Sequence, residues 1–240
     1  MYRTVAVAAI LLWMHAPSVL AGPPRQPKAE GIEAEDYKWA KFRGEFKEGV
    51  LAVGDAGRGK KFYEVCAACH LSSGAGRADG MFPQIAGQHV AVIIKQMADI
   101  RFGVRDNPVM YPYAATLNDP QELADIAAYI RTLKIPHDNG KGAGTNLKRG
   151  EELYRSDCVE CHGRNGEGSE RKFYPVLAGQ HYTYLLRQAL EIRDGKRRNA
   201  DPHMVRVIKD YSNADIGAVV DYMSRLTMPE RAAKAKKSGK

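Results

Sequence analysis

Apolar residues recur three or four positions apart in four stretches of the chain, which is the spacing of one face of an amphipathic helix. These stretches span residues 90–100, 119–133, 182–192 and 213–226. A shorter helix is predicted to run into each of two cysteine motifs, ending near Val65 and near Asp157. No segment between the cysteine motifs and the following prolines shows the alternation of a strand, so the pattern predicts an all-α fold.

The pattern occurs twice. The segment Cys66-Ala67-Ala68-Cys69-His70 recurs 92 positions later as Cys158-Val159-Glu160-Cys161-His162. At the same offset, residues 82–89 (FPQIAGQH) match residues 174–181 (YPVLAGQH). A self-similar period is the mark of a duplicated structural unit. The chain therefore contains two copies of a unit of roughly 85 residues.

Each cysteine motif has the form C-x-x-C-H, the attachment site for c-type haem. Cys66, Cys69, Cys158 and Cys161 would form the thioether bonds, and His70 and His162 would each lie beneath an iron. Three alternatives fit less well. A thioredoxin-type redox pair requires a βαβ pattern, a zinc site made of four cysteines needs its pairs much closer together, and two disulfides would leave both histidines unexplained. The motifs predict two covalently bound haem c groups.

The second axial ligand is methionine or histidine in a low-spin electron carrier, whereas an enzyme often leaves that position open. Met110 and Met204 are the only methionines that pair with each other in the two copies, and each follows a proline in a predicted loop. We assign them as the iron ligands opposite His70 and His162. His89 and His181 also match each other, so bis-histidine ligation remains an alternative, while His203 matches Val109 and is disfavoured.

Pro83 and Pro175 each follow their motif histidine by 13 residues. A backbone carbonyl there would accept the Nδ1–H of the histidine and thereby fix its tautomer and ring orientation. The alternative is an ordinary loop proline.

Outside the repeats, residues 1–21 have a basic residue, a short apolar run and small residues before Ala21, as in a cleaved secretory signal. We predict a signal peptide (1–21), an extension (22–56), two haem units (57–136 and 146–227), a glycine-rich linker (137–145) and a basic tail (228–240). The extension is either a short helix on the first unit, with Tyr37, Trp39, Phe42 and Phe46 on one side, or a partly ordered leader.

The formal charge of +8 is concentrated toward the C-terminus. Residues 55–140 carry nine basic and nine acidic side chains, whereas residues 141–226 carry 15 basic and 12 acidic ones. No dense basic stripe or recognisable module indicates nucleic-acid binding. The lysine-rich tail, Arg231 to Lys240, predicts docking to acidic partners and peripheral contact with a membrane surface.

With these motifs the chain resembles the dihaem cytochrome c4 family over residues 57–226. The resemblance rests on the tandem C-x-x-C-H motifs, the PxxAGQH segments at 83–89 and 175–181, and the loop methionines 110 and 204. It implies two tandem class I cytochrome c domains related by a pseudo-twofold axis, with haems meeting near the interface. The departures are the extension, the tail, and Leu71 at the position of Gly163.

These expectations lead to two hypotheses about the function of the chain. The first is a periplasmic carrier that passes single electrons between respiratory-chain proteins toward a terminal oxidase or reductase; it is not itself an enzyme. The alternative is a haem enzyme, or the dihaem subunit of one, such as a sulfur-compound dehydrogenase or a peroxidase. An open or exchangeable iron position would distinguish the enzyme from the carrier.

Overall fold

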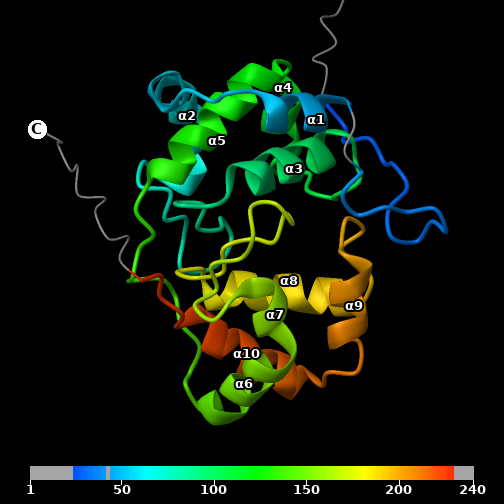
Figure 1. Cartoon of the computed structure of the whole chain (residues 1–240), viewed down its shortest axis with the longest axis vertical. Coiled ribbons are helices and arrows are strands. Elements are labelled where there is room, and N and C mark those ends of the chain that lie inside the picture. The colour runs from blue at the N-terminus through cyan, green and yellow to red at the C-terminus, as the bar shows by residue number, and fades with distance from the viewer. Residues whose placement is uncertain (1–23, 42–43, 230–240) are drawn as a thin grey trace, which may run out of the picture.

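The computed structural model describes residues 24–41 and 44–229 as two helical units, one above the other (Figure 1). Within these ranges no β-sheet forms, and the only extended pairing is an isolated bridge between Ser169 and Tyr174. The prediction of an all-α fold is confirmed. The predicted signal segment 1–21, the tail from residue 230 and Phe42 lie outside the described residues.

The upper unit contains the helices α1 (Gly44–Leu51), α2 (Ala56–His70), α3 (Val90–Arg101), α4 (Tyr111–Thr116) and α5 (Pro120–Thr132). Polar caps begin the two longest helices: Asp55 accepts the backbone N–H of Arg58, and Asp119 accepts that of Gln121. A capping carboxylate satisfies a backbone donor that the first helical turn leaves free. The predicted apolar faces at 90–100 and 119–133 therefore form helices close to the expected bounds.

The lower unit repeats this arrangement with α6 (Leu147–Leu153), the π-helical turn η1 (Tyr154–Cys158), α7 (Val159–His162), α8 (Tyr182–Arg193), α9 (Pro202–Ile208) and α10 (Asn213–Ser224). Its core joins α6, α8 and α10 around apolar side chains that include Tyr154, Ile208 and Ile216. Among the described residues, no helix is long and apolar enough to cross a membrane.

In each unit the helix that leads into the cysteine motif, α2 or α6, crosses the last helix at a glycine. A Cβ on Gly59 would lie 1.9 Å from the carbonyl oxygen of Asp125 on α5, and a Cβ on Gly150 would lie 2.1 Å from that of Ala218 on α10. Only glycine permits so close an approach of two backbones. The two crossings are equivalent, which extends the repeat beyond the haem motifs.

The helices before the cysteine motifs continue further than predicted. They run through both motifs and end at His70 and His162, because each histidine is followed by a residue with positive φ. Gly163 adopts this conformation (φ 76°) with ease, whereas Leu71 adopts it (φ 64°) against its side chain. The expected ends near Val65 and Asp157 were therefore wrong by about one helical turn.

The second motif is preceded by one extra residue. Tyr63 and Tyr154 are equivalent, since each donates its hydroxyl to the carbonyl just beyond the motif histidine, Tyr63 to Leu71 and Tyr154 to Gly163. Tyr154 lies four residues before Cys158, but Tyr63 lies three before Cys66. The π-helical turn η1 takes up the extra residue, as such turns do at functional positions. Tyr154 and Cys158 can therefore take the same positions in the second unit as Tyr63 and Cys66 take in the first.

Paired hydrogen bonds join the two units across a pseudo-twofold axis. The Gln88 side chain accepts from the backbone N–H of Val176 (2.8 Å) and donates to its carbonyl (3.0 Å). The equivalent Gln180 makes the same two bonds to the backbone of Gln84 (3.0 and 2.8 Å). Because residue 84 is equivalent to residue 176, the two units hold each other by the same contacts.

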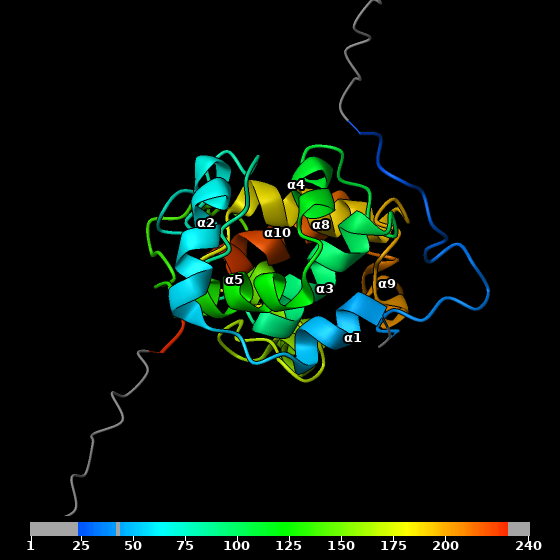
Figure 2. The same cartoon turned by 90° about the horizontal axis from the view of Figure 1, so that it is seen from above.

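Residues 24–41 and α1 contact both units (Figures 1 and 2). Gln26 donates to carbonyls of the first unit, while Arg198 of the second unit donates to the carbonyl of Ala29. Trp39 stacks on Tyr174 of the second unit with ring centroids 5.7 Å apart. The helix interpretation is right for α1, where Phe46 is buried, and wrong for Tyr37 and Trp39, which lie in irregular turns.

Candidate haem sites

The two cysteine motifs open into one continuous cavity between the units, with a volume of about 1020 Å³. The side chains of the first motif line one part of it and those of the second motif line another, namely Cys66, Cys69, His70, Cys158, Cys161 and His162. Ordinary small-molecule sites occupy about 300–1000 Å³. The cavity is therefore large enough for an extended cofactor at each motif.

All four cysteines are free thiols in the structure. Burial raises the pKa of Cys66 to about 11 and that of Cys158 to about 12, so both are protonated at neutral pH. No group of three or more histidine, cysteine or acidic side chains within the described ranges is arranged to hold a metal ion. The zinc and disulfide alternatives therefore find no support, and the thiols remain available for thioether formation.

His70 is buried, and a hydrogen bond at its Nδ1 fixes the orientation of its ring. Its Nδ1 lies 2.9 Å from the carbonyl oxygen of Pro83, which leaves Nε2 as the nitrogen available to a metal. Burial lowers the pKa of His70, and the Pro83 carbonyl opposes this in part. The ring is therefore neutral at pH 7, the state a metal ligand needs.

His162 is held less tightly. Its Nδ1 is buried without a hydrogen-bond partner of good geometry. Burial nevertheless lowers its pKa to about 4, with the Pro175 carbonyl acting in the opposite direction. The two histidines are alike in charge state, but the first has the better-defined orientation.

Met110 and Met204 both line the cavity, as do Met81, Met97 and Met223. Met110 lies at the end of a loop as the cap of α4, and its backbone N–H donates to the side chain of Asn107. Met204 was expected in a loop but lies in the first turn of α9, because Asp201 caps this helix and Pro202 begins it. Lining the cavity does not by itself distinguish an iron ligand from the other methionines. The assignment of Met110 and Met204 rests on their equivalence in the repeat.

His89 and His181 are engaged at the interface rather than in the cavity. Nε2 of His89 lies 2.8 Å from the carbonyl of Glu167, and Nε2 of His181 lies 2.8 Å from that of the equivalent Ala75. Nδ1 of His181 also accepts the backbone N–H of Gly140. These contacts disfavour the bis-histidine alternative and explain why both histidines occur in the repeat.

A half-buried ring of polar side chains, which sequence reasoning missed, lines the cavity at the pseudo-twofold axis. Arg105 donates to the side-chain oxygens of Gln96 (2.9 Å) and Gln188 (3.0 Å). Arg197 donates to the same two oxygens, at 3.1 and 2.9 Å respectively. Arg105 and Arg197 lie 92 residues apart, as do the two glutamines, so the matching offset was the signal that would have found the ring.

The ring concentrates positive charge along the wall of the cavity. Burial, and then the neighbouring Arg105, lower the pKa of Arg197 to about 10, so the side chain stays charged at pH 7. The arginines also lower the pKa of the Tyr184 hydroxyl against the effect of its burial. Partly buried cations without enough acidic partners favour an anionic ligand. Haem c carries two carboxylate side chains, so the cavity fits it in charge as well as in size.

Comparison with known proteins agrees with this geometry. The sequence pattern of the Cytochrome c family matches residues 56–134 and 147–227. Cytochrome c4 of Pseudomonas aeruginosa is 36% identical over 185 residues, which cover 73% of this chain and 90% of that protein. The thiosulfate dehydrogenase electron acceptor of Stutzerimonas stutzeri is 35% identical over 69% of this chain and 80% of its own length.

The fold agrees as well. The crystal structure of reduced cytochrome c4 from Pseudomonas stutzeri superposes with a TM-score of 0.66 at 34% identity, covering 72% of this chain and 99% of that one. Two tandem cytochrome c domains of this family imply two covalently bound haem c groups per chain and an exchange of electrons with redox partners. This chain belongs to the cytochrome c4 family of dihaem electron-transfer cytochromes.

Proposed function

We propose that the chain is a periplasmic carrier that passes single electrons between respiratory-chain proteins, toward a terminal oxidase or reductase. The observation that carries the proposal is the pair of equivalent sites in one cavity, each with two thiols, a neutral buried histidine and a methionine. A carrier needs iron sites that change little when an electron arrives. Two protein ligands on each iron meet this need, because neither site then keeps a position for substrate.

In this assignment, Cys66 and Cys69 would attach the first haem, and His70 and Met110 would hold its iron. The equivalent residues would attach the second haem and hold its iron, namely Cys158, Cys161, His162 and Met204. The haem supplies an iron that cycles between its ferrous and ferric states.

The protein contributes orientation and charge around each iron. The Pro83 carbonyl holds the His70 ring by its Nδ1–H, and the Pro175 carbonyl is assigned the same role for His162. Arg105 and Arg197 line the cavity, where they would be available to pair with the haem carboxylates, and their charge would disfavour the additional positive charge of ferric iron. Thioether ligation and burial act in the same direction, so both haems are expected at positive potentials.

The second candidate function is that of electron acceptor for a sulfur-compound dehydrogenase. Its support is the 35% identity to the thiosulfate dehydrogenase electron acceptor, which is nearly as high as that to cytochrome c4. This role uses the same two haems and differs in the donor alone. A peroxidase, by contrast, needs an open iron position, and the paired methionines disfavour one.

Replacement of the methionines tests the proposal. The ferric wild-type protein should show two low-spin haems, a sulfur-to-iron charge-transfer band and no rapid binding of cyanide. Met110→Ala or Met204→Ala should open one iron to cyanide, lower its potential and halve the band. Met97→Leu is the matched control, because Met97 lines the same cavity but aligns with Ala189 in the repeat.

The opposite pattern contradicts the carrier assignment. Rapid cyanide binding at one wild-type haem would show an open iron and would favour the enzyme alternative. A charge-transfer band that survives in the Met110→Ala, Met204→Ala double variant would show that other residues ligate the irons.

Export and membrane contact form a separate part of the proposal. We assign residues 1–21 as a signal peptide cleaved near Ala21, and the basic tail 228–240 as the segment that touches acidic partners or a membrane surface. Mass spectrometry of the mature protein tests the cleavage. Flotation with anionic vesicles, comparing the full chain with a chain ending at residue 230, tests the tail.

A further inference from the structure

Exposed apolar side chains gather in one part of this molecule. Within the described ranges, every large apolar side chain that is more than a third exposed lies between Leu51 and Tyr113. The second cytochrome unit has none among its described residues. Single exposed apolar residues are common on protein surfaces. A set that occurs in only one of two equivalent units is not explained by that general tendency and indicates a specific role.

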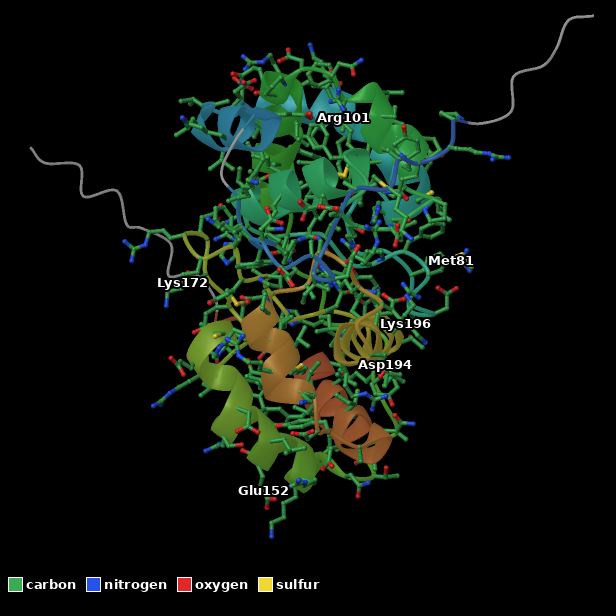
Figure 3. The ribbon with its side chains drawn as sticks, turned by 90° about the vertical axis from the view of Figure 1, so that its right-hand side faces the viewer. Met81, Arg101, Glu152, Lys172, Asp194 and Lys196 are labelled. Atoms are coloured by element: carbon green, nitrogen blue, oxygen red, sulfur yellow. The ribbon has the colours of Figure 1, made fainter. Side chains whose placement is uncertain are left out.

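Four of these side chains also line the haem cavity, and we call them the apolar rim: Val65, Met81, Val109 and Tyr113, which are 62%, 62%, 65% and 41% exposed. Val65 immediately precedes Cys66 on α2, and Val109 immediately precedes Met110. Met81 extends from its loop at the side of the molecule (Figure 3). Each rim residue therefore faces both the solvent and the cavity, and two of the four adjoin assigned haem-binding residues of the first site.

The equivalent positions of the second unit are polar or covered. Asp157 replaces Val65, and His203 replaces Val109; both are exposed. Val207, equivalent to Tyr113, packs against the core of its unit. The second haem site therefore has no apolar rim.

The remaining rim position is Met81, and the N-terminal extension covers its counterpart in the second unit. Phe173, equivalent to Met81, packs edge-on against Trp39 and Phe46 with ring centroids 6.4 and 5.2 Å apart. Lys172, beside Phe173, lies on the opposite side of the molecule from Met81 (Figure 3). The extension thus covers this position in one unit and leaves its counterpart bare in the other.

We propose that the apolar rim is where a redox partner docks, and that this partner presents a weakly charged apolar face around its own cofactor. The inference deepens the proposed electron-carrier function and rests on it. Charge supports the choice of partner, because residues 55–140 carry nine basic and nine acidic side chains and so give no net electrostatic steering.

The exposed area of the apolar rim also supports a partner that binds transiently. Four partly exposed side chains present on the order of 400 Å², about half of what each partner contributes to a stable interface. Small interfaces are typical of transient redox encounters, whereas a stable dimer buries more. A short-lived apolar contact at the first haem suits a carrier that must release each partner quickly.

Stopped-flow mixing tests the proposal with a cupric blue-copper protein, whose copper lies beneath an apolar face, as the probe. Each encounter moves one electron from a ferrous haem to the cupric ion, which becomes cuprous, and no bond is made or broken. Val109→Glu and Met81→Glu should each slow the second-order reaction at least tenfold. His203→Glu, the matched control at the equivalent position, should change it less than twofold.

Two controls accompany these rates. The wild-type rate should change less than twofold between low and high salt, because residues 55–140, which carry the rim, have no net charge. Val109→Glu and His203→Glu should shift their haem potentials alike and slow the reaction with ascorbate, a small reductant, to the same extent, because each adds one carboxylate beside an assigned iron ligand. These controls separate lost docking from a damaged haem site.

Three results would overturn the inference: equal slowing by His203→Glu and Val109→Glu, a steep fall of the wild-type rate with salt, or a dimer in sedimentation that Val109→Glu dissociates. The last result would identify a second copy of the chain as the occupant. Failure of the electron-carrier function looks different, because one wild-type haem would then bind cyanide rapidly.

Discussion

The crossing of α2 and α5 at Gly59 gives a prediction with a definite sign. In Gly59→Ala the new Cβ would lie 1.9 Å from the Asp125 carbonyl oxygen and 2.4 Å from its carbon. Ordinary contacts of this kind are about 3.4 Å or longer. One helix must therefore move by more than an ångström, and both atoms that block it belong to the backbone.

The movement disturbs more than one contact. The Asp125 carboxylate accepts the backbone N–H of Asp55 at 2.7 Å and two bonds from Arg58, so it links the start of α2 to α5. Overpacking alone costs about 1–3 kcal/mol, and a buried acceptor left without a donor costs about 1–3 kcal/mol more. We expect Gly59→Ala to lose at least about 2 kcal/mol of unfolding free energy.

Guanidinium unfolding of the purified ferric protein, followed by far-ultraviolet circular dichroism, measures this loss. The midpoint of the first-unit transition should fall by about 0.5–1 M. Gly57→Ala is the matched control on the same helix, because its Cβ meets only the Asp55 carboxylate, at 3.1 Å. That variant should gain up to about 1 kcal/mol from helix propensity. A loss below about 1 kcal/mol in Gly59→Ala, or equal losses in the two variants, would refute the close crossing.

Two further predictions concern charge. The hydrogen bond from Arg58 holds the pKa of Asp125 below its usual 3.8, so this carboxylate stabilises the fold above about pH 4 and ceases to as pH falls through its lowered value. Asp125→Asn should therefore lower stability at pH 7 and flatten its decline between pH 4 and 2, which denaturation at several pH values measures. Arg197→Gln removes a cation from the wall of the cavity, so ferric iron is disfavoured less and a haem potential should fall by tens of millivolts. A spectroelectrochemical titration identical to that of the wild type would show that the ring does not act on the irons.

Much of this fold follows from local pattern. The apolar faces at 90–100 and 182–192 became α3 and α8, because their periodicity, the preceding Gly-Gln-His turn and the cytochrome repeat all favour the same helix. The haem motifs were readable because covalent attachment imposes a fixed spacing. The spacing does not reveal where a helix ends, however. Positive φ at Leu71 and Gly163 decides that, and a leucine gives no warning of it.

The interface could not be predicted, because its contacts join a side chain in one unit to the backbone of the other. Gln88 and Gln180 repeat in the sequence, yet their partner positions are Val176 and Gln84, whose side-chain types differ. A backbone partner sets no requirement on residue type, so the pairing leaves no mark in the sequence. The same holds for His89 and its partner, the Glu167 carbonyl.

The symmetry of these bonds bears on how the two haems come to differ. Equivalent atoms join the units, so the interface itself treats both sites alike. The differences arise around it. The extension adds Trp39 beside Tyr174, whereas Phe82, the equivalent of Tyr174, has Arg77 over its ring instead. Charge adds a second difference, since residues 141–226 carry three more basic than acidic side chains. A positive surrounding favours the ferrous state, so charge alone places the second haem at the higher potential. Electrons that enter through the apolar rim at the first haem would then move toward the second.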